Sequence, residues 1–244
     1  MSAGVLLRSV AYVLVQLVVT PVYAAVSLLT FPFAALTRYR IISSWSRLMV
    51  WLAEHLCGIR YRVLGAANIP QEPCIVLSKH ESAWETLALQ VVFPPQVWVI
   101  KRELLWVPFF GWGLAMLSPI AIDRRDGRRA LRQTVEQGRE RIAEGFSIVV
   151  FPEGTRSAPG IRGTYQPGGA WLALQTGAPV VPVAHNAGDC WPRNSFLKYP
   201  GLVTISIGPA MRAPNEKAAA LTQRVENWIE NETQRIRGDE RSEI

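Results

Sequence analysis

The chain has 244 residues, of which 49% are hydrophobic and 18% charged, and this composition excludes an intrinsically disordered protein. The 26 Lys and Arg against 19 Asp and Glu give a net charge of +7, which favours an anionic partner: nucleic acid, an anionic membrane surface or a phosphorylated substrate. The sequence contains no zinc-finger spacing, RNA-binding aromatic signature or basic heptad region, so nucleic acid is the weakest of the three.

The N-terminal segment has no charged residue between Arg8 and Arg38, a run longer than the ~20 residues that span a hydrocarbon core. We predict a membrane helix over about residues 5 to 30, kinked or broken near Pro21. Three arginines follow by residue 47, whereas Arg8 alone precedes, which places the bulk of the protein in the cytoplasm. A re-entrant pair of helices has the same consequence. The predicted location is a bacterial-type inner membrane, with the domain that follows the helix on the cytoplasmic side.

Two alternatives exist for this segment. Arg8, the apolar stretch and Val22-Tyr23-Ala24 resemble a cleaved signal peptide, and a buried core helix is the second alternative. The apolar run continues past the potential cleavage site and is long for a core helix, which favours the membrane helix. A second apolar stripe follows at helical spacing, and it either packs on the domain or lies on the membrane. Its members are Trp45, Leu48, Met49, Leu52 and Leu56.

From about residue 60, short apolar runs alternate with longer segments of helical periodicity. The predicted strands are Cys74–Ser78, Val97–Lys101, Pro119–Asp123, Ser147–Phe151, Pro179–Ala184 and Val203–Ile207. The predicted helices cover about residues 83–92, 103–116, 127–144, 167–176 and 215–237. This alternation predicts an α/β fold with a mostly parallel central sheet flanked by helices. We divide the chain into an N-terminal membrane-associated helical segment, residues 1–58, and an α/β catalytic domain, residues 59–244.

The cysteines and histidines are few. Cys57, Cys74 and Cys190 lie far apart and form neither a metal-binding spacing nor a disulfide framework. We therefore expect reduced, buried thiols, which suit a cytoplasmic domain, and no metal site. A histidine general base has only three candidates, which are His55, His80 and His185.

The first segment that carries chemistry runs from Ser78 to Glu85, directly after a predicted strand, where open α/β sheets bind ligands. His80 and Glu85 are five residues apart, about 140° on a continuous helix. They meet only if His80 lies in the loop and Glu85 in the first helical turn, with Ser82 as the N-cap. Two interpretations remain open: Glu85 orients a His80 general base, or Glu85 completes a capping box with Ser82.

The second segment, Phe151–Ser157, also follows a predicted strand. Gly154 permits a tight turn, and Thr155 adds a hydroxyl. Arg156 offers a planar fork for a phosphate, and Glu153 is able to accept hydrogen bonds from substrate hydroxyls. On these residues alone an ordinary polar turn is the favoured interpretation, and a substrate-binding turn formed by the four residues is the alternative.

The third segment supplies cations at two strand ends. Lys101 and Arg124 each close a predicted strand, so both are expected at the same mouth, where they suit an anionic head group. The arginines that follow Arg124 are instead assigned to a solvated or lipid-facing helix flank. They are Arg125, Arg128, Arg129 and Arg132.

Four blocks, in order over about residues 74 to 186, resemble the 1-acyl-glycerol-3-phosphate acyltransferases of the wider glycerolipid acyltransferase family. His80 and Glu85 match a block of His, four residues and an acid, although Asp is the commonest acid there. Residues 101–124 match the second block. Phe151–Arg156 match the Phe-Pro-Glu-Gly-Thr-Arg block, and residues 180–183 match a short apolar block. The first and third blocks together, at this separation, are highly specific.

The resemblance implies direct acyl transfer without an acyl-enzyme. His80 would take the proton from the free sn-2 hydroxyl of 1-acyl-glycerol-3-phosphate as this hydroxyl attacks acyl-CoA or acyl-acyl carrier protein, giving phosphatidic acid. Lys101 or nearby backbone amides would hold the developing oxyanion. Arg124 and Arg156 would bind the phosphate, and Glu153 would contact the glycerol. No cofactor is implied. The implied partners are the lysophospholipid, the acyl thioester, membrane lipid and, for one donor, acyl carrier protein.

Other functions compete with this one. The acceptor is alternatively another lysolipid, such as a lyso-aminolipid, because arginines also bind carboxylates. A serine hydrolase would use Ser78 or Ser82 with His80, but no Gly-x-Ser-x-Gly elbow occurs. A non-catalytic protein that binds anionic lipid explains the charge and the anchor but not the His80 and Phe151 blocks. Acyl-chain length, the donor and the oligomeric state are not encoded by these motifs.

Overall fold

The protein is described by a computed structural model that covers residues 2–93, 95–123 and 127–242. Its strands form one sheet in the order β1-β7-β6-β2-β5-β3-β4. Their bounds are β1 Ile59–Leu64, β2 Ile75–Ser78, β3 Gln96–Lys101, β4 Ile120–Ile122, β5 Ser147–Val150, β6 Val180–His185 and β7 Gly201–Ile207. The strands from β6 to β4 pair in parallel, whereas β7 is antiparallel to β6 and parallel to β1. The predicted α/β fold with a mostly parallel sheet is confirmed.

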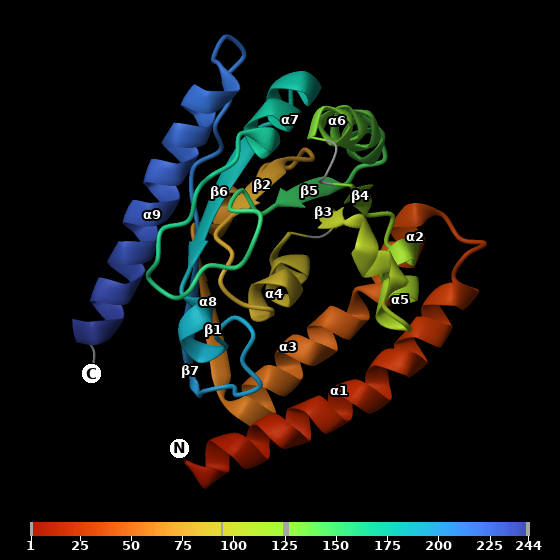
Figure 1. Ribbon diagram of the computed structural model, residues 1–244, viewed down its shortest axis with the longest axis vertical. Helices are drawn as coiled ribbons and strands as arrows, with labels where there is room; N and C mark the ends of the chain where they lie inside the picture. Colours follow the sequence, from red (N-terminus) through yellow and green to blue (C-terminus); the bar gives the residue numbers. More distant parts are fainter. Residues whose placement is uncertain (1, 94, 124–126, 243–244) are drawn as a thin grey trace.

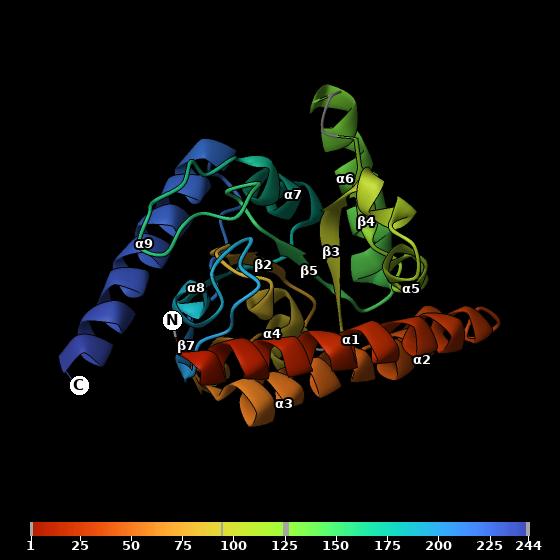
Figure 2. The same ribbon diagram turned by 60° about the horizontal axis from the view of Figure 1, so that its bottom comes forward.

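Helices cover both faces of the sheet (Figures 1 and 2). One face carries α6 (Gly127–Ala143), α7 (Gly168–Thr176) and α9 (Ala218–Ser242). The other face carries α4 (Trp84–Val92) and α3 (Ser44–Cys57), with α1 (Ala3–Leu29) outermost beside α3. The central strands β2 and β6 are buried at every position, as expected for Val- and Ile-rich strands between two helical layers.

Short helices complete the chain. They are α2 (Ala35–Ile42), α5 (Phe110–Met116), α8 (Ala187–Cys190) and the 3₁₀ helices η1 (Ala66–Asn68) and η2 (Arg102–Trp106). The single helix predicted over about residues 103–116 is therefore wrong, because η2 and α5 are separate. Pro108 lacks an amide hydrogen, and Phe109 has a φ of 61°, which a regular helix does not allow.

The apolar helix α1 is continuous through Pro21, so the predicted helix is confirmed and the predicted break is wrong. Packing on α3 and on α5 holds the helix on both sides of the proline. Its buried residues are mostly polar, namely Ser9, Tyr12, Ala24 and Ser27. Its exposed side chains are large and apolar, namely Leu6, Leu7, Leu14, Leu17, Val18, Val22, Val26, Leu28 and Leu29. A surface helix of a water-soluble protein has the opposite arrangement, with its apolar side chains buried and its polar side chains exposed.

The segment between α1 and the sheet packs on the α/β domain. The second apolar stripe is helix α3, and Met49 and Leu52 of this stripe are buried. This helix ends at Cys57 with Gly58 in a left-handed cap, and β1 begins directly at Ile59. The division of the chain at residue 58 stays a prediction, although these two elements meet there.

Candidate active site

The chemistry-bearing segments meet at one edge of the sheet. His80 follows β2, the Phe151 block follows β5, and Lys101 ends β3. These three strands are neighbours and run in parallel, so their carboxyl ends open on the same side. Three segments that lie far apart in the sequence thereby line one cavity, and its lining residues His80 and Arg156 are 76 positions apart.

His80 and Glu85 form a short hydrogen bond. The Nδ1 atom of His80 lies 2.6 Å from Oε1 of Glu85. His80 lies in the loop after β2, and Glu85 is the second residue of α4, as the five-residue spacing requires. The same Oε1 atom accepts the amide hydrogen of Ser82 at 3.1 Å, while the Ser82 hydroxyl accepts from the Trp84 amide at 3.0 Å. The N-cap position itself is Ala83, one residue later than predicted.

The charge state of Glu85 determines the tautomer of His80. Burial opposes ionisation of Glu85, but the hydrogen bonds from the His80 ring and from the Ser82 amide hold its carboxyl pKa below the ordinary value. The ionised Glu85 accepts the Nδ1 hydrogen. The Nε2 atom of His80 is then left with a lone pair and is able to accept a proton.

The backbone and ring of His80 are held by the Phe151 block. The His80 amide donates to Oε1 of Glu153 at 3.0 Å, and its carbonyl accepts from the Ser157 amide at 2.8 Å. The imidazole stacks on the ring of Phe151 with centroids 3.9 Å apart and planes 17° apart. The two blocks therefore form one structural unit, in which the second fixes the position of the first.

Glu153 is placed behind this loop and away from the cavity. Its side chain is 2% exposed, and its second oxygen lies 3.3 Å from Nζ of the buried Lys79. Among the described residues that line the cavity, Glu153 does not occur, whereas its neighbours Gly154 and Thr155 do. Glu153 thus contacts the His80 backbone, and its contact with the substrate glycerol stays a prediction.

A second histidine supports the same loop. The Ala187 amide donates to Nδ1 of His185 at 3.2 Å, so the remaining hydrogen is on Nε2, which donates to the Lys79 carbonyl at 2.8 Å. Burial lowers the pKa of His185, against the opposing charge of Glu85. His185 is therefore a neutral, fully buried structural residue, which sequence alone did not separate from a candidate base.

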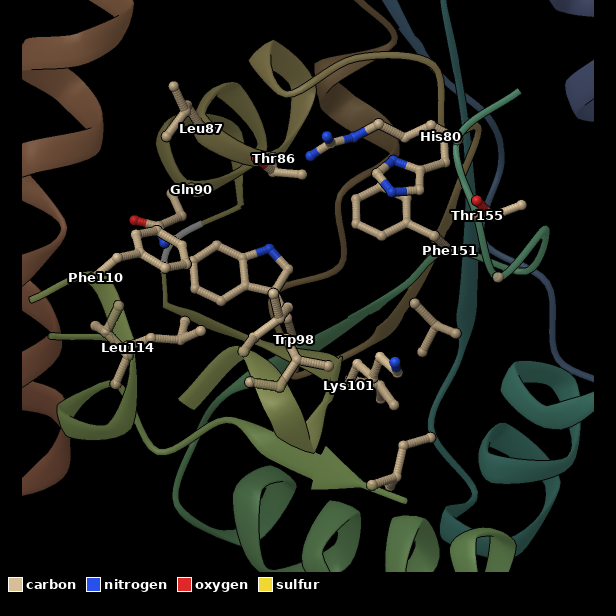
Figure 3. A pocket seen from close by; sticks show the side chains of 18 of the residues that line it. His80, Thr86, Leu87, Gln90, Trp98, Lys101, Phe110, Leu114, Phe151 and Thr155 are labelled. Carbon is tan, nitrogen blue, oxygen red and sulfur yellow. The ribbon is translucent and has the colours of Figure 1, made fainter. Parts of the chain in front are cut away.

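A cavity of about 790 Å³ opens beside the His80 imidazole (Figure 3). One end lies between His80 and Thr155, the middle passes Trp98, and the other end reaches Phe110 and Leu114 of α5 (Figure 3). Helices α1, α2 and α3 close this far end. Their contributions are Thr20, Tyr23, Ala24, Ile42 and Trp45. The cavity is polar where the imidazole lies and apolar where the helices meet.

Cations line the polar end. Lys101 lines the cavity with a half-exposed side chain 3.5 Å from Glu103. Arg156 also lines it, and its Nε atom is buried without a hydrogen-bond partner among the described residues. Gly154 has a φ of 70°, the left-handed conformation that its predicted tight turn needs. Arg124 lies outside the described residues, so its predicted place stays a prediction.

Arg193 is a cavity residue that the sequence analysis missed. It follows α8 in the loop before β7, and its NH1 group donates to the Arg156 carbonyl at 2.7 Å. The neighbouring Asn194, with a φ of 56°, also lines the cavity. A single arginine in an irregular loop has no periodicity or spacing that identifies it. Only the fold brings Arg193 next to Arg156.

The serine hydrolase alternative finds no support at His80. The Ser78 hydroxyl donates to the Lys79 carbonyl at 3.0 Å, and the Ser82 hydroxyl accepts from Trp84. Neither hydroxyl is hydrogen-bonded to the His80 ring within the described residues. In that part of the chain, no group of three or more His, Cys, Asp or Glu residues is arranged to hold a metal ion.

Comparisons with known proteins identify the family of this chain. A family model described as Acyltransferase matches residues 60–186. A 1-acyl-sn-glycerol-3-phosphate acyltransferase of Pseudomonas aeruginosa is 50% identical over 202 residues, covering 81% of this chain and 78% of the relative. The human 1-acyl-sn-glycerol-3-phosphate acyltransferase alpha is 34% identical over 139 residues, covering 56% of this chain and 49% of the relative.

The fold also has a solved counterpart. The crystal structure of a 1-acyl-sn-glycerophosphate (LPA) acyltransferase from Thermotoga maritima matches with a TM-score of 0.81 over 96% of each chain, at 22% identity. The likeness covers nearly the whole chain, so it includes the N-terminal helices as well as the sheet. Together with the matches in sequence, it leads to one conclusion: the chain belongs to the acyltransferase family, in the group of the 1-acyl-sn-glycerol-3-phosphate acyltransferases.

Proposed function

We propose that this enzyme moves a fatty acyl group from acyl-CoA or acyl-acyl carrier protein to the sn-2 hydroxyl of 1-acyl-glycerol-3-phosphate, giving phosphatidic acid. The observation that carries the proposal is the 2.6 Å hydrogen bond between His80 and Glu85 at the polar end of a largely apolar cavity. The relatives named as 1-acyl-sn-glycerol-3-phosphate acyltransferases support the acceptor.

The proposed reaction is an addition to the thioester carbonyl followed by an elimination of the thiolate. The Nε2 atom of His80 takes the hydroxyl proton while the hydroxyl oxygen bonds to the thioester carbonyl carbon. The tetrahedral intermediate then collapses, the carbon–sulfur bond breaks, and the imidazolium returns the proton to the leaving thiolate. Glu85 stabilises the imidazolium between these two steps. No bond forms between enzyme and acyl group.

The cations at the polar end fit the charges of this reaction. Arg156 and Arg193 both line the cavity, and the Arg193 side chain donates to the Arg156 backbone carbonyl. We assign both guanidinium groups to the phosphate of the acceptor. Lys101, or a backbone amide of the strand-end loops, would stabilise the developing oxyanion. Arg124 is proposed as a further phosphate ligand on the strength of the family resemblance alone.

The apolar end of the cavity fits an acyl chain. Trp98, Phe110 and Leu114 line it, and α1 closes it on the outside. An acyl chain that enters there leaves water, which supplies about 0.8 kcal/mol for each buried methylene. The proposal therefore places the acyl group along the cavity with its carbonyl near His80.

We also propose that the outward face of α1 lies on a membrane, on the cytoplasmic side of a bacterial-type inner membrane. By length and composition α1 is able to cross a bilayer, but it packs along the domain over its whole length, which supports a helix that lies in the interface. Replacing Leu14 and Leu17 with Asp should abolish flotation with anionic vesicles. The matched change Ile161→Asp, on the α9 side, should not, and equal flotation of both variants would refute the proposal.

A product assay tests the reaction. Purified enzyme receives a mixture of acyl-CoA and acyl-acyl carrier protein donors with equal amounts of several acceptors: lysophosphatidic acid, a lyso-aminolipid and monoacylglycerol. Mass spectrometry should show phosphatidic acid as the main product. If the acylated lyso-aminolipid were the main product, the lyso-aminolipid and not lysophosphatidic acid would be the acceptor. Lipid binding without any product would support the non-catalytic alternative and refute the proposal.

A further inference from the structure

Both chain neighbours of His80 carry buried charges that pair with the same helix, α9. The Nζ atom of Lys79, whose side chain is 1% exposed, lies 2.8 Å from Oε1 of Glu230. On the other side, the fully buried carboxylate of Glu81 lies 2.7 Å from the guanidinium of Arg237. Glu230 and Arg237 are seven residues apart, about two helical turns, so they share one face of α9.

The two ion pairs have opposite polarity. The cation Lys79 meets an anion on α9, and Glu81, when ionised, meets a cation about two helical turns further along α9. A shift of α9 by two turns would bring like charges together, so the pairs specify a single register. Buried ion pairs add little net stability compared with apolar contacts, whereas breaking one is strongly destabilising. A role in fixing geometry therefore explains these pairs better than a role in stability alone.

The first pair continues to the His80 backbone. Lys79 also lies 3.3 Å from Glu153, which accepts the His80 amide hydrogen through its other oxygen. On the α9 side, the Tyr165 hydroxyl donates to Glu230 at 2.8 Å. An unbroken series of short polar contacts thus runs from α9 to the histidine.

Helix α9 packs on the sheet through buried apolar side chains and lies outside the substrate cavity. It packs against β6 and α7 on the face of the sheet opposite α1 (Figures 1 and 2). The side chains that anchor it are Leu221, Val225, Ile229 and Ile236, all buried. Within the described part of the chain, no residue of α9 lines the cavity. Among the described residues, the ion pairs between α9 and the chain neighbours of His80 are made by Lys79 and Glu81.

We propose that α9 positions the His80 imidazole, with Glu230 acting through Lys79 and Arg237 acting through Glu81. The tethers hold the loop after β2 so that Nδ1 meets Glu85 and Nε2 faces the cavity. This inference rests on the proposed function. Because α9 does not touch the cavity, loss of a tether should slow acyl transfer and leave the binding of both substrates unchanged.

The kinetic test compares matched variants on one helix. Glu230→Gln and Arg237→Gln should lower kcat about tenfold or more, with KM for lysophosphatidic acid and for acyl-CoA unchanged. The controls are Glu226→Gln, which breaks an ion pair with Arg162, and Arg235→Gln, whose partners lie on α9 itself. Both controls should retain the wild-type kcat. Arg237→Lys keeps the charge and should recover part of the loss.

A spectroscopic test does not depend on turnover. The hydrogen-bonded Nδ1 proton of His80 should give a far-downfield proton resonance, which is assignable by its loss in His80→Ala because the chain has three histidines. Glu230→Gln and Arg237→Gln should shift or broaden this resonance, and the controls should not. If the folded tether variants keep both the wild-type kcat and the wild-type resonance, the inference is overturned. Absence of turnover in the wild-type enzyme would instead refute the proposed function, with the resonance still testing the tethers.

Discussion

At the scale of single residues, Glu85 serves two donors with one oxygen. Its Oε1 atom accepts from the His80 ring and from the Ser82 amide. The structure therefore contains the Glu85 contact that each of the two interpretations requires, so one does not exclude the other, and the role of His80 as the base stays a prediction. The hydrogen bond from the Ser82 amide orients the Glu85 carboxylate, and the oriented carboxylate fixes the tautomer of His80.

Glu85→Gln separates charge from hydrogen bonding. The Gln oxygen is still able to accept from both donors, so the free energy of unfolding should change by only about 1–2 kcal/mol. The missing charge no longer stabilises the imidazolium, so kcat should fall by about 10² or more. Steady-state kinetics and urea denaturation measure the two effects.

Glu85→Asp serves as the control, since it keeps the charge and shortens the side chain by one methylene. It should retain more activity than Glu85→Gln. Wild-type activity in the Gln variant would leave Glu85 with a capping role only and His80 acting without it.

Sequence predicted the residue types of the site better than their contacts. The Phe151 block is predicted to bind substrate, and within it Glu153 is predicted to contact the glycerol. In the structure Glu153 lies against Lys79, 74 positions earlier in the chain, and against the His80 amide. Arg193 had no sequence signal at all. Such long-range pairings depend on strand order, which local patterns do not encode.

Arg193→Gln tests the added phosphate ligand. Loss of one guanidinium should raise KM for lysophosphatidic acid about tenfold, near 1.4 kcal/mol, with kcat changed little. KM for monoacylglycerol, which has no phosphate, should stay the same. The matched control is Arg212→Gln, an exposed arginine paired with Glu72 away from the cavity. An equal effect on both acceptors would contradict the assignment.

Titration of Glu81 should make the free energy of unfolding depend on pH. Burial raises its pKa to about 7, despite the charges of Arg237 and Lys79, with Asp189 adding to the rise. The folded state therefore binds a proton that the unfolded state has released between about pH 4.5 and 7. Across this window the Glu81 contribution to the free energy of unfolding should fall as pH rises, by up to about 1.4 kcal/mol per pH unit, and level off above pH 7.

The measurement is the difference in unfolding free energy between wild type and Glu81→Gln at pH 5, 6, 7 and 8. Urea denaturation gives each value, and the subtraction removes the titration of other groups. A difference that does not vary with pH would show that Glu81 titrates as an ordinary exposed carboxyl.

At the scale of elements, periodicity identified most strands and the long helices. Strand β1, with the exposed arginine Arg60 and the half-buried Arg62, was missed, because it is an edge strand that does not read as a continuous apolar run. Helix α9 extends to Ser242, beyond the predicted end near residue 237. The separation of η2 from α5 was also missed, although Pro108 marks it. The consequence matters for function, since α5 forms the far end of the cavity.

The length of the cavity should set the acyl-chain preference. Leu114→Trp fills the α5 end, so long donors lose contacts there. Each excluded methylene forfeits about 0.8 kcal/mol, so two methylenes change the donor preference by about tenfold towards shorter chains. The product distribution from mixed acyl-CoA donors measures this shift. An unchanged distribution, with the variant folded and active, would place the acyl chain elsewhere.

At the scale of the whole molecule, the two faces of the sheet have different roles. On one face α1 and α3 present apolar side chains outward and close the cavity. On the other face α9 holds the loop that carries His80. A lysolipid in a bilayer would approach from the α1 side. The loop that carries the His80 imidazole contacts α9 on the opposite side of the sheet. The central claim is that His80 is the base in acyl transfer to lysophosphatidic acid.

The most direct measurement of this claim is the rate of phosphatidic acid formation by purified wild-type enzyme and by His80→Ala, with acyl-CoA and lysophosphatidic acid as substrates. Thermal unfolding of both proteins controls for folding. The predicted result is formation of phosphatidic acid by the wild type and a rate about 10² to 10⁴ lower in a folded His80→Ala. A folded His80→Ala enzyme with a near-normal rate would contradict the account.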